Sequence, residues 1–524
     1  MTKGYGIDFG TTNSIISRYD TDLVYSIGWT DFTDDDFGRP YPSVVWYKSD
    51  HSVEVGKKAK TNINKYSDQI GNKFISSVKS KLGQNYSYHI FGKDKKAVDV
   101  ATDIFKLLKR KKEEKEEEEK QRQENIIIQP KNKLNATEKL EAVVTIPIDF
   151  DGKARRELRQ AAYNAGVYIK SFIQEPYAAI VAHCWEKAGD KYIERLIDKN
   201  YLVMDWGGGT LDITIAKITE NGFQVLAFEG QNNIGGDVFD EKLMKVVEHK
   251  FVKQIAEKHH STITQSELNS DKKDALKQDC ENCKIDLSEL LEREVSIPNF
   301  FRLGDKSLPL IEQITRSEFE ELILHEVNAG IEKVFEALDK ARLTKDEIDS
   351  VLLIGGSCNI PLIKEKMIDI FGSSVETVSK PDCIIARGAA LIDAIGLSPI
   401  LQNDISIKLE NNSYYPIFKA KSPIEKLQKE TRVRLYCVDP RDGWAKIVVT
   451  DMKQPIKQVL GTLSVPVATN WNIRECGPQR LELKAHIDQD MVIHFKGHAD
   501  NNKNIESIEI YDIPFGLSLN IDKK

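Results

Sequence analysis

The stretch Tyr201–Ile218, YLVMDWGGGTLDITIAKI, places a glycine-rich turn between two apolar runs. The runs are typical of a buried strand and of the strand that returns beside it. The three glycines Gly207–Gly209 remove every Cβ from the turn, so its N–H groups can approach an anion, of which phosphate is the usual one. Asp205 adds a carboxylate that suits Mg²⁺ held partly through water. An ordinary flexible hairpin is the alternative, and the acidic and hydroxyl residues around the turn make it the weaker one.

Residues 4–18 repeat this pattern near the start of the chain. Both stretches run in the order strand, aspartate, apolar residue, glycine, hydroxyl-rich turn and returning strand, with Asp8 in the place of Asp205. A repeat about 200 residues apart predicts two related lobes that face each other. We therefore expect each lobe to bring one aspartate and one phosphate-binding hairpin to a common cleft.

Composition excludes several classes of protein. The chain has 524 residues, enough for two or more domains, and its net charge of −7 argues against nucleic-acid binding. It contains neither a signal-peptide pattern at the start nor an apolar run of membrane-spanning length. Seven cysteines fit a reducing compartment better than a disulfide framework. We expect a soluble, cytoplasmic protein.

The paired motifs GIDFGTTNS and DWGGGTLDITI resemble the two phosphate motifs of the DnaK-type, seventy-kilodalton heat-shock chaperones, within the actin and sugar-kinase superfamily. The resemblance implies an α/β, actin-like (ribonuclease H-like) two-lobed ATPase domain over residues 1–395. An interdomain linker would follow at 396–403. From residue 404 to 524 the sequence alternates between apolar and polar residues with short turns, which predicts an antiparallel β-sandwich.

The resemblance also implies which residues act on ATP and Mg²⁺. Asp8 and Asp205 would orient the water molecules of the metal. Lys79, in FISSVKSKLG, would reach the terminal phosphates, and Glu175 would polarise the attacking water. Thr210 completes the set of catalytic residues. From the residues alone, Lys81 would be as good a candidate as Lys79, and a glutamate before a proline is equally a helix-start residue.

The remaining nucleotide contacts follow from the same resemblance. NIGGDVFD and VLLIGGSCNIP both place glycines at a helix start, which suits the phosphates and the ribose. CENCKIDLS would contact adenosine through side chains three and four residues apart on one helical face. Asn359 departs from the family pattern, because many relatives have a stacking arginine there. The expected cofactor-binding residues are Gly10, Thr11, Thr12, Asn13, Gly207, Gly208, Gly209, Gly235, Gly236, Glu281, Lys284, Ser288, Gly355, Gly356, Ser357 and Asp382.

Two further segments resemble parts of the family that connect its domains. Pro147 and Arg155 would relay the nucleotide state to the outer surface, although a strand end and an ordinary ion pair would explain them equally well. The linker has the apolar residues of the family but is interrupted by Ser398-Pro399. No long helical sequence follows the β-domain, so the family's helical lid is expected to be missing.

Cys280 and Cys283 form a Cys-x-x-Cys pair. A zinc site needs a second pair or histidines at comparable spacing, and redox motifs usually begin a helix, whereas this pair lies within one. Structural cysteines are the better interpretation. A weaker hypothesis is that oxidation of this pair, near Cys358 of the other adenosine segment, blocks nucleotide binding.

Two functions from different classes remain open at this point. The first is an ATP-hydrolysing chaperone whose β-domain holds an unfolded peptide, served by a J-domain co-chaperone and a nucleotide exchange factor. The second is a nucleotide-regulated module with negligible hydrolysis that binds one dedicated partner. The intact catalytic set favours the first, and the interrupted linker and missing lid favour the second. A sugar kinase is a poorer third option, because it leaves the β-domain without a purpose.

Overall fold

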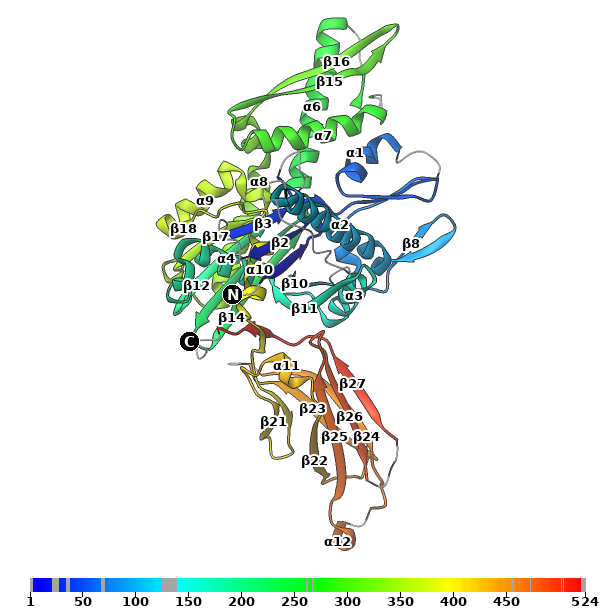
Figure 1. Cartoon of the computed structure of the whole chain (residues 1–524), viewed down its shortest axis with the longest axis vertical. Coiled ribbons are helices and arrows are strands. Elements are labelled where there is room, and N and C mark those ends of the chain that lie inside the picture. Colours follow the sequence, from blue (N-terminus) through cyan, green and yellow to red (C-terminus); the bar gives the residue numbers. More distant parts are fainter. Residues whose placement is uncertain are drawn as a thin grey trace.

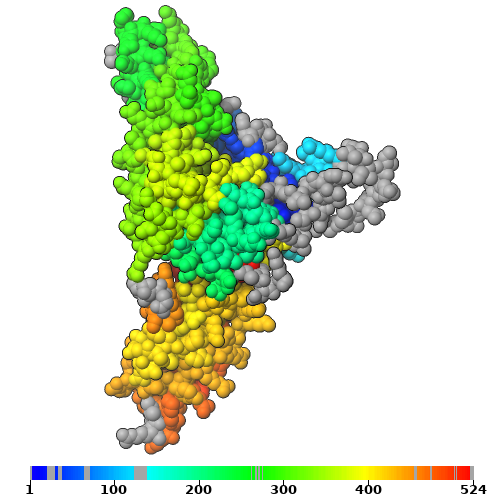
Figure 2. Space-filling model, turned by 90° about the vertical axis from the view of Figure 1, so that its left-hand side faces the viewer, coloured from blue at the N-terminus to red at the C-terminus, as the bar shows by residue number. Residues whose placement is uncertain are grey.

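The computed structural model in Figure 1 describes residues 3–20, 28–33, 38–66, 71–124, 139–260, 263–265, 268, 270–453, 457–471, 473–500, 502 and 504–519. The molecule is elongated, and the strands from Ile405 to Ile510 form one end of it in both whole-molecule views (Figures 1 and 2). No helix in the described ranges combines the length and the apolar character needed to cross a membrane.

Two mixed sheets form the centre of the molecule, and we call the parts built on them lobe I and lobe II. The lobe I sheet has the order β11-β10-β1-β2-β3, and the lobe II sheet has the order β18-β17-β12-β13-β14. The lobe I strands are β1 (Gly4–Phe9), β2 (Asn13–Asp20), β3 (Gly28–Phe32), β10 (Leu140–Ile146) and β11 (Val167–Gln174). The lobe II strands are β12 (Lys199–Trp206), β13 (Thr210–Thr219), β14 (Gly222–Asn232), β17 (Ser350–Ile354) and β18 (Val375–Glu376).

The two sheets share one topology. In each, a central strand pairs antiparallel with the strand that returns from its glycine turn and parallel with a strand that arrives much later in the chain. The outer strands also match, with a parallel pair on one side and an antiparallel pair on the other. The predicted internal repeat is therefore present in the strand order itself.

Two apolar helices, α4 (Glu175–Ala188) and α10 (Ile384–Ile395), pack between the lobes. Glycines allow this close packing. A Cβ on Gly388 of α10 would lie 1.8 Å from the Ala178 carbonyl oxygen of α4, and a Cβ on Gly6 of β1 would lie 2.2 Å from the Ala390 nitrogen. The helices therefore rest backbone to backbone, and the ends of β1 and β12 lie on either side of this layer.

Further elements surround the two sheets, and α1, α6, α7, β15 and β16 lie above them in Figure 1. Those of lobe I are β4 (Tyr41–Pro42), β5 (Val45–Tyr47), β6 (Val53–Val55), α1 (Lys57–Tyr66), β7 (Lys73–Ile75), the short 3₁₀ helix Val78–Lys81, β8 (Ser87–Ile90), β9 (Lys93–Lys96), α2 (Ala97–Glu124) and α3 (Gly152–Asn164). Those of lobe II are α5 (Tyr192–Leu196), α6 (Gly236–His259), α7 (Ser270–Asp286), β15 (Glu292–Leu303), β16 (Lys306–Thr315), α8 (Arg316–Ala341) and α9 (Pro361–Phe371).

The last part of the chain, which we call the β-domain, contains two four-stranded antiparallel sheets of order β21-β20-β23-β24 and β22-β25-β26-β27. Phe418 of one sheet packs against Phe495 of the other, with ring centroids 6.4 Å apart. The elements are β19 (Pro399–Leu401), β20 (Ile405–Lys408), β21 (Tyr414–Phe418), α11 (Ile424–Leu427), β22 (Thr431–Cys437), β23 (Trp444–Asp451), β24 (Gln458–Pro466), α12 (Ile473–Cys476), β25 (Gln479–Ile487), β26 (Ile493–Ala499), β27 (Glu506–Ile510) and β28 (Phe515–Leu517).

Candidate functional site

A cavity of about 1010 Å³ opens between the lobes, where β1 and β12 end. Asp8 and Asp205 both line it, each one residue before the end of its strand. Most of the residues predicted from the sequence meet there. Those lining the cavity are Asp8, Gly10, Thr11, Thr12, Asn13, Lys79, Glu175, Asp205, Gly207, Gly208, Thr210, Gly236, Glu281, Lys284, Ser288, Gly355, Gly356, Ser357 and Asp382.

Two predicted contact residues, Gly209 and Gly235, do not line the cavity. Both glycines instead make contacts between the β12–β13 turn and the segment that leads into α6. The Gly209 carbonyl accepts a hydrogen bond of 3.0 Å from the Asn233 N–H, and a Cβ on Gly235 would lie only 2.6 Å from the Gly207 carbonyl oxygen. These glycines therefore hold the β12–β13 turn against the start of α6, so that the two predicted phosphate segments form one surface.

Lys79 provides a buried cation beside the carboxylates. Its Nζ donates a 2.7 Å hydrogen bond to Glu175 Oε1, and both side chains are almost fully buried. Burial lowers the pKa of Lys79, but the charges of Glu175 and Asp8 outweigh it and the net shift is upward. Lys81, the alternative candidate, does not line the cavity and lies over the ring of Tyr86. The fold therefore distinguishes two lysines that the sequence could not.

Asp212 is a site residue that the sequence prediction did not include. It lies directly opposite Asp205 in the β12–β13 pairing and lines the same cavity. Burial and the nearby Glu175 carboxylate raise its pKa to about 7. Its signal was present in the turn, because two-residue alternation places Thr210 and Asp212 on the same face of β13.

The three aspartates of this cluster, Asp8, Asp205 and Asp212, all have raised pKa values when the cavity holds no cation. Burial, then Glu175, raises the pKa of Asp8 to about 7, and burial raises the pKa of Asp205 well above its ordinary value. Such a cluster suits a hard divalent cation, which replaces the protons and offsets the repulsion. In the described part of the chain, no three acidic, histidine or cysteine side chains converge closely enough to ligate a metal.

The segments predicted to contact adenosine also contribute apolar and amide side chains to the cavity. Ile285 and Asn359 line it, and the Asn359 side chain donates to the Gly356 carbonyl at 3.2 Å. Lys284 is held by Asp240 at 2.8 Å and by the Gly236 carbonyl at 3.0 Å. Ser288 lies just beyond the end of α7 and not within it, yet still lines the cavity. Position 359 therefore presents an amide to the cavity and not an arginine side chain.

Helix α1 closes the cavity from the lobe I side, which sequence reasoning missed. Lys57, Lys60 and Thr61 of this helix line the cavity, and Lys60 Nζ bonds to Glu281 Oε1 of lobe II at 2.6 Å. This ion pair bridges the opening between the lobes. The sequence of α1 is that of an ordinary polar surface helix, so nothing in it pointed to the site.

The three cysteines of the adenosine segments are buried free thiols. Burial raises the pKa of Cys283 to about 12, and it also raises the pKa values of Cys280 and Cys358. Thiolates are the reactive form of cysteine, so these side chains have little nucleophilic character. This environment agrees with structural cysteines and weakens the oxidation hypothesis.

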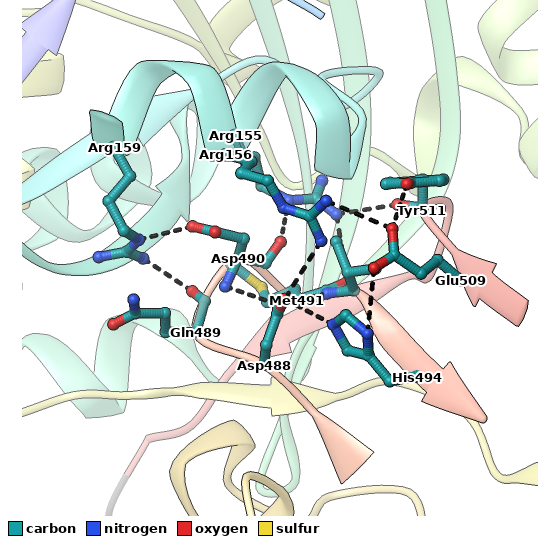
Figure 3. Close-up of polar contacts among 11 residues, drawn as sticks. Arg155, Arg156, Arg159, Asp488, Gln489, Asp490, Met491, His494, Glu509 and Tyr511 are labelled. Carbon is teal, nitrogen blue, oxygen red and sulfur yellow. Dashed lines mark hydrogen bonds and ion pairs between the residues drawn. The ribbon is translucent and has the colours of Figure 1, made fainter. Parts of the chain in front are cut away.

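Pro147 follows the end of β10 and Arg155 lies on the next helix, α3, and the two residues face different parts of the molecule. Pro147 lines the cavity, whereas Arg155 on α3 points toward the β-domain (Figure 3). The Arg155 guanidinium is buried and donates to the carbonyl oxygens of Asp490 at 2.7 Å and Tyr511 at 3.0 Å. Burial lowers its pKa to about 10, so it remains a cation near neutral pH. Arg155 therefore joins lobe I to the β-domain.

Comparison with known proteins agrees with this geometry. The sequence profile of the family described as "Hsp70 protein" matches residues 5–411. The chaperone protein DnaK of Thermosipho africanus is 29% identical over 514 residues, which cover 93% of this chain and 76% of the relative. DnaK of Thermotoga maritima is 28% identical over 516 residues, with 93% and 77% covered. DnaK of Mycoplasma mycoides is 30% identical over 393 residues, with 74% and 58% covered. With a family match across more than half of its length, the chain belongs to the Hsp70 family.

Proposed function

We propose that the protein is a chaperone of the Hsp70 family that binds Mg²⁺-ATP between its lobes and hydrolyses it to ADP and phosphate. One observation carries the proposal. Two hairpins of identical topology bring Asp8 and Asp205 to a single cavity that also holds the buried Lys79–Glu175 pair. A nucleoside triphosphate needs an anion-binding surface for its phosphates and, beside it, carboxylates for its metal.

The phosphate end uses backbone N–H groups and one cation. The turns Gly10–Asn13 and Gly207–Gly209 would cradle the phosphates, and Mg²⁺ would neutralise charge on the phosphate oxygens when bound. Lys79 stabilises negative charge that develops during transfer. Glu175, held by Lys79, is placed to accept a hydrogen bond from the attacking water. Thr210 would orient that water at the entrance of β13.

The nucleoside end gives affinity and selectivity. Glu281 and Lys284 of α7, and Ser288 just beyond its end, would contact the ribose and base, and Asp382 lines the same cavity. A Cβ on Gly355 would come within 2.6 Å of Asp205 Oδ1, so only glycine fits between the nucleoside and the metal end. Because Asn359 offers no guanidinium, we expect purine affinity to be lower than in relatives with arginine there.

The rest of the chain would bind a client, with an affinity that depends on the nucleotide state. We propose that residues 1–395 form the nucleotide-binding unit, 396–403 the connection and 404–524 the part that binds a client. The DnaK relatives are chaperones by name, so an unfolded peptide is the first candidate ligand, in the cytoplasm, with J-domain and exchange-factor helpers. A dedicated folded partner with little ATP turnover is the second, and the fixed contacts between Arg155 and the β-domain favour it.

ATP turnover measured with and without unfolded peptide tests the proposal. We expect measurable hydrolysis by the wild type, stimulation by peptide, and a loss of about 100- to 1000-fold in kcat for Lys79→Ala. Lys81→Ala is the matched control and should keep the wild-type rate. Absence of hydrolysis, or an unchanged rate in Lys79→Ala, would overturn the enzyme proposal. A rate indifferent to every peptide would keep the ATPase and discard the chaperone role.

A further inference from the structure

The segment Pro514–Leu519, which we call the strap, runs from the β-domain back onto lobe II. Its strand β28 pairs antiparallel with the connecting strand β19, and the Ser518 N–H bonds to the Ser398 carbonyl at 3.0 Å. Leu517 and Leu519 are almost completely buried, in the same hydrophobic cluster as Phe223 of lobe II. The strap is thus part of the core of another domain.

The strap and lobe II meet backbone to backbone. A Cβ on Gly222, at the start of β14, would lie 2.3 Å from the Leu517 carbonyl oxygen. In the reverse direction, a Cβ on Gly516 would lie 2.3 Å from the Phe223 carbonyl oxygen. Real Cβ atoms do not come so close, so each side of this contact depends on a glycine. Contacts of this closeness belong to packed interiors and not to transient surfaces.

The connecting strand is enclosed by the same contact. Leu397 and Ile400 are buried, and Ile400 Cδ1 lies 3.2 Å from the position of a Cβ on Gly222. Since β19 pairs with β28, it cannot leave lobe II unless the strap separates from it or moves with it. The strap therefore closes over the connection between the domains.

Lobe I holds the β-domain at a separate point, the loop 488–492 between β25 and β26. Arg155 and Arg159 of α3 reach this loop, where Arg159 Nε lies 2.5 Å from Asp490 Oδ1 (Figure 3). Arg159 also donates to the Gln489 carbonyl at 2.7 Å. The β-domain is consequently fastened to lobe I by charged hydrogen bonds and to lobe II by apolar burial.

We propose that the strap is a built-in anchor that keeps the β-domain docked on the lobes in the empty, ADP and ATP states. The comparison of states depends on the proposed nucleotide binding, whereas the anchoring itself does not. Movement between the lobes would then reach the β-domain through its two attachments while it stays bound. The β-domain would thus be attached to lobe II through the strap and to lobe I through the loop 488–492, and would connect the two lobes.

The test is the rate at which a protease cuts the connection 396–404 in the full chain. We expect the wild-type rate to vary less than about twofold among empty, ADP and ATP samples, because cleavage follows local opening. Leu517→Asp should raise the rate at least about tenfold. Gly222→Val, which disturbs the contact from lobe II without changing the β-domain, should do the same. Ile505→Asp, the same kind of change at a largely exposed site, is the control and should leave the rate unchanged.

Small-angle scattering on the same samples separates opening from unfolding. A larger radius of gyration with unchanged circular dichroism is expected for the two strap variants. The proposal is overturned if the wild type is cut about tenfold faster with ADP than with ATP, or if both strap variants match the wild type. Calorimetric titration with nucleotide, run in parallel, reports the proposed function separately: no binding there would refute that function, while the comparison of variants would still decide the role of the strap.

Discussion

Gly208, in the β12–β13 turn, lies beside Thr12 of the β1–β2 turn. An added Cβ would lie 3.1 Å from Thr12 Oγ1 and 3.2 Å from Asp237 Oδ1, which is tighter than ordinary contact. The branches of a valine would project into the proposed phosphate surface. We predict that Gly208→Val weakens ATP binding by about 10- to 100-fold, because the valine branches would occupy space that the phosphates need. Calorimetric titration measures the change, and an unchanged melting temperature shows that the fold is intact. Normal affinity would mean that the turn does not face the nucleotide.

Asp212 makes the folding stability of the protein depend on pH, and the direction follows from its raised pKa. Its pKa of about 7 in the folded protein lies above that of an unfolded aspartate, so the folded state holds more protons between about pH 4 and 7. Stability without metal or nucleotide should therefore fall as pH rises through this window, by up to about 1.4 kcal/mol per pH unit for this group. We predict that Asp212→Asn gains stability relative to the wild type between pH 5 and 8. Denaturant unfolding at several pH values tests this, and a constant difference would contradict it.

The residues that sequence reasoning found share one property, which is that short local patterns determine them. Asp8, Asp205 and the glycines beside them belong to turns whose chemistry is readable within about ten residues. Lys60 and Thr61 could not be found this way. They reach the cavity only because α1 folds over its opening, and no local pattern encodes that placement.

At the scale of elements, one carboxylate connects two layers of lobe II. Glu376 of β18 accepts hydrogen bonds from Lys187 on α4, Arg195 on α5 and Ser350 on β17, and it lies 3.0 Å from His183. Hydrogen bonding to His183, then to Lys187 and Ser350, holds the pKa of Glu376 well below its ordinary range. The stabilisation is thus complete above about pH 5 and is lost as pH falls below about 4.

We predict that Glu376→Gln lowers the free energy of unfolding by roughly 1.5–3 kcal/mol at pH 7, because bonds to a charged acceptor are lost. The difference from the wild type should shrink below about pH 4, because the unfolded chain then binds a proton at this carboxylate while the folded state still keeps it ionised. Urea titrations at pH 7 and pH 3.5 provide the comparison. Equal destabilisation at both values would show that the charge of Glu376 is not what stabilises this junction.

Helix α3 provides the contact with the loop 488–492. We predict that Arg155→Lys speeds amide exchange in this loop by about 10- to 100-fold, because one ammonium cannot replace a guanidinium that serves several buried carbonyl groups. Arg156→Lys is the matched control. Arg156 is half exposed and pairs with Asp488 and Glu509 at 3.6 Å and 3.3 Å, so its effect should be small. Equal effects of the two substitutions would contradict a special role for Arg155.

Helix and strand boundaries were predicted well where one sequence periodicity runs through the whole segment, and poorly where the periodicity changes. Opposite charges at i, i+4 spacing predict a helix over residues 99–124, and the structure has one over Ala97–Glu124. The sequence after NIGGDVFD predicts one helical stretch up to about Leu291, and this is wrong, because α6 ends at His259 and α7 runs only from Ser270 to Asp286. Polar residues without clear periodicity separate the two helices. The hairpin β15–β16 that follows was not predicted, because its buried and exposed positions alternate while its sequence does not: Glu312 is buried and Ile311 is exposed.

At the scale of the whole molecule, the repeat was predictable and the docking was not. Two similar motifs about 200 residues apart implied paired lobes, and the strand orders of the two sheets match in the structure. The position of the β-domain depends on contacts between residues more than 300 apart, such as Arg155 with Asp490. No pattern in the sequence reports such contacts. The linker was predicted from its apolar residues and the resemblance to the family, and neither indicated that its strand β19 is paired and buried.

Structure determination of the protein with Mg²⁺ and ADP tests the central claim most directly. The account predicts one nucleotide per chain, with its phosphates between the turns Gly10–Asn13 and Gly207–Gly209. The metal should lie beside Asp8 and Asp205, joined to them mainly through water. A nucleotide bound elsewhere, or a cavity that stays empty at saturating concentration, would contradict the account.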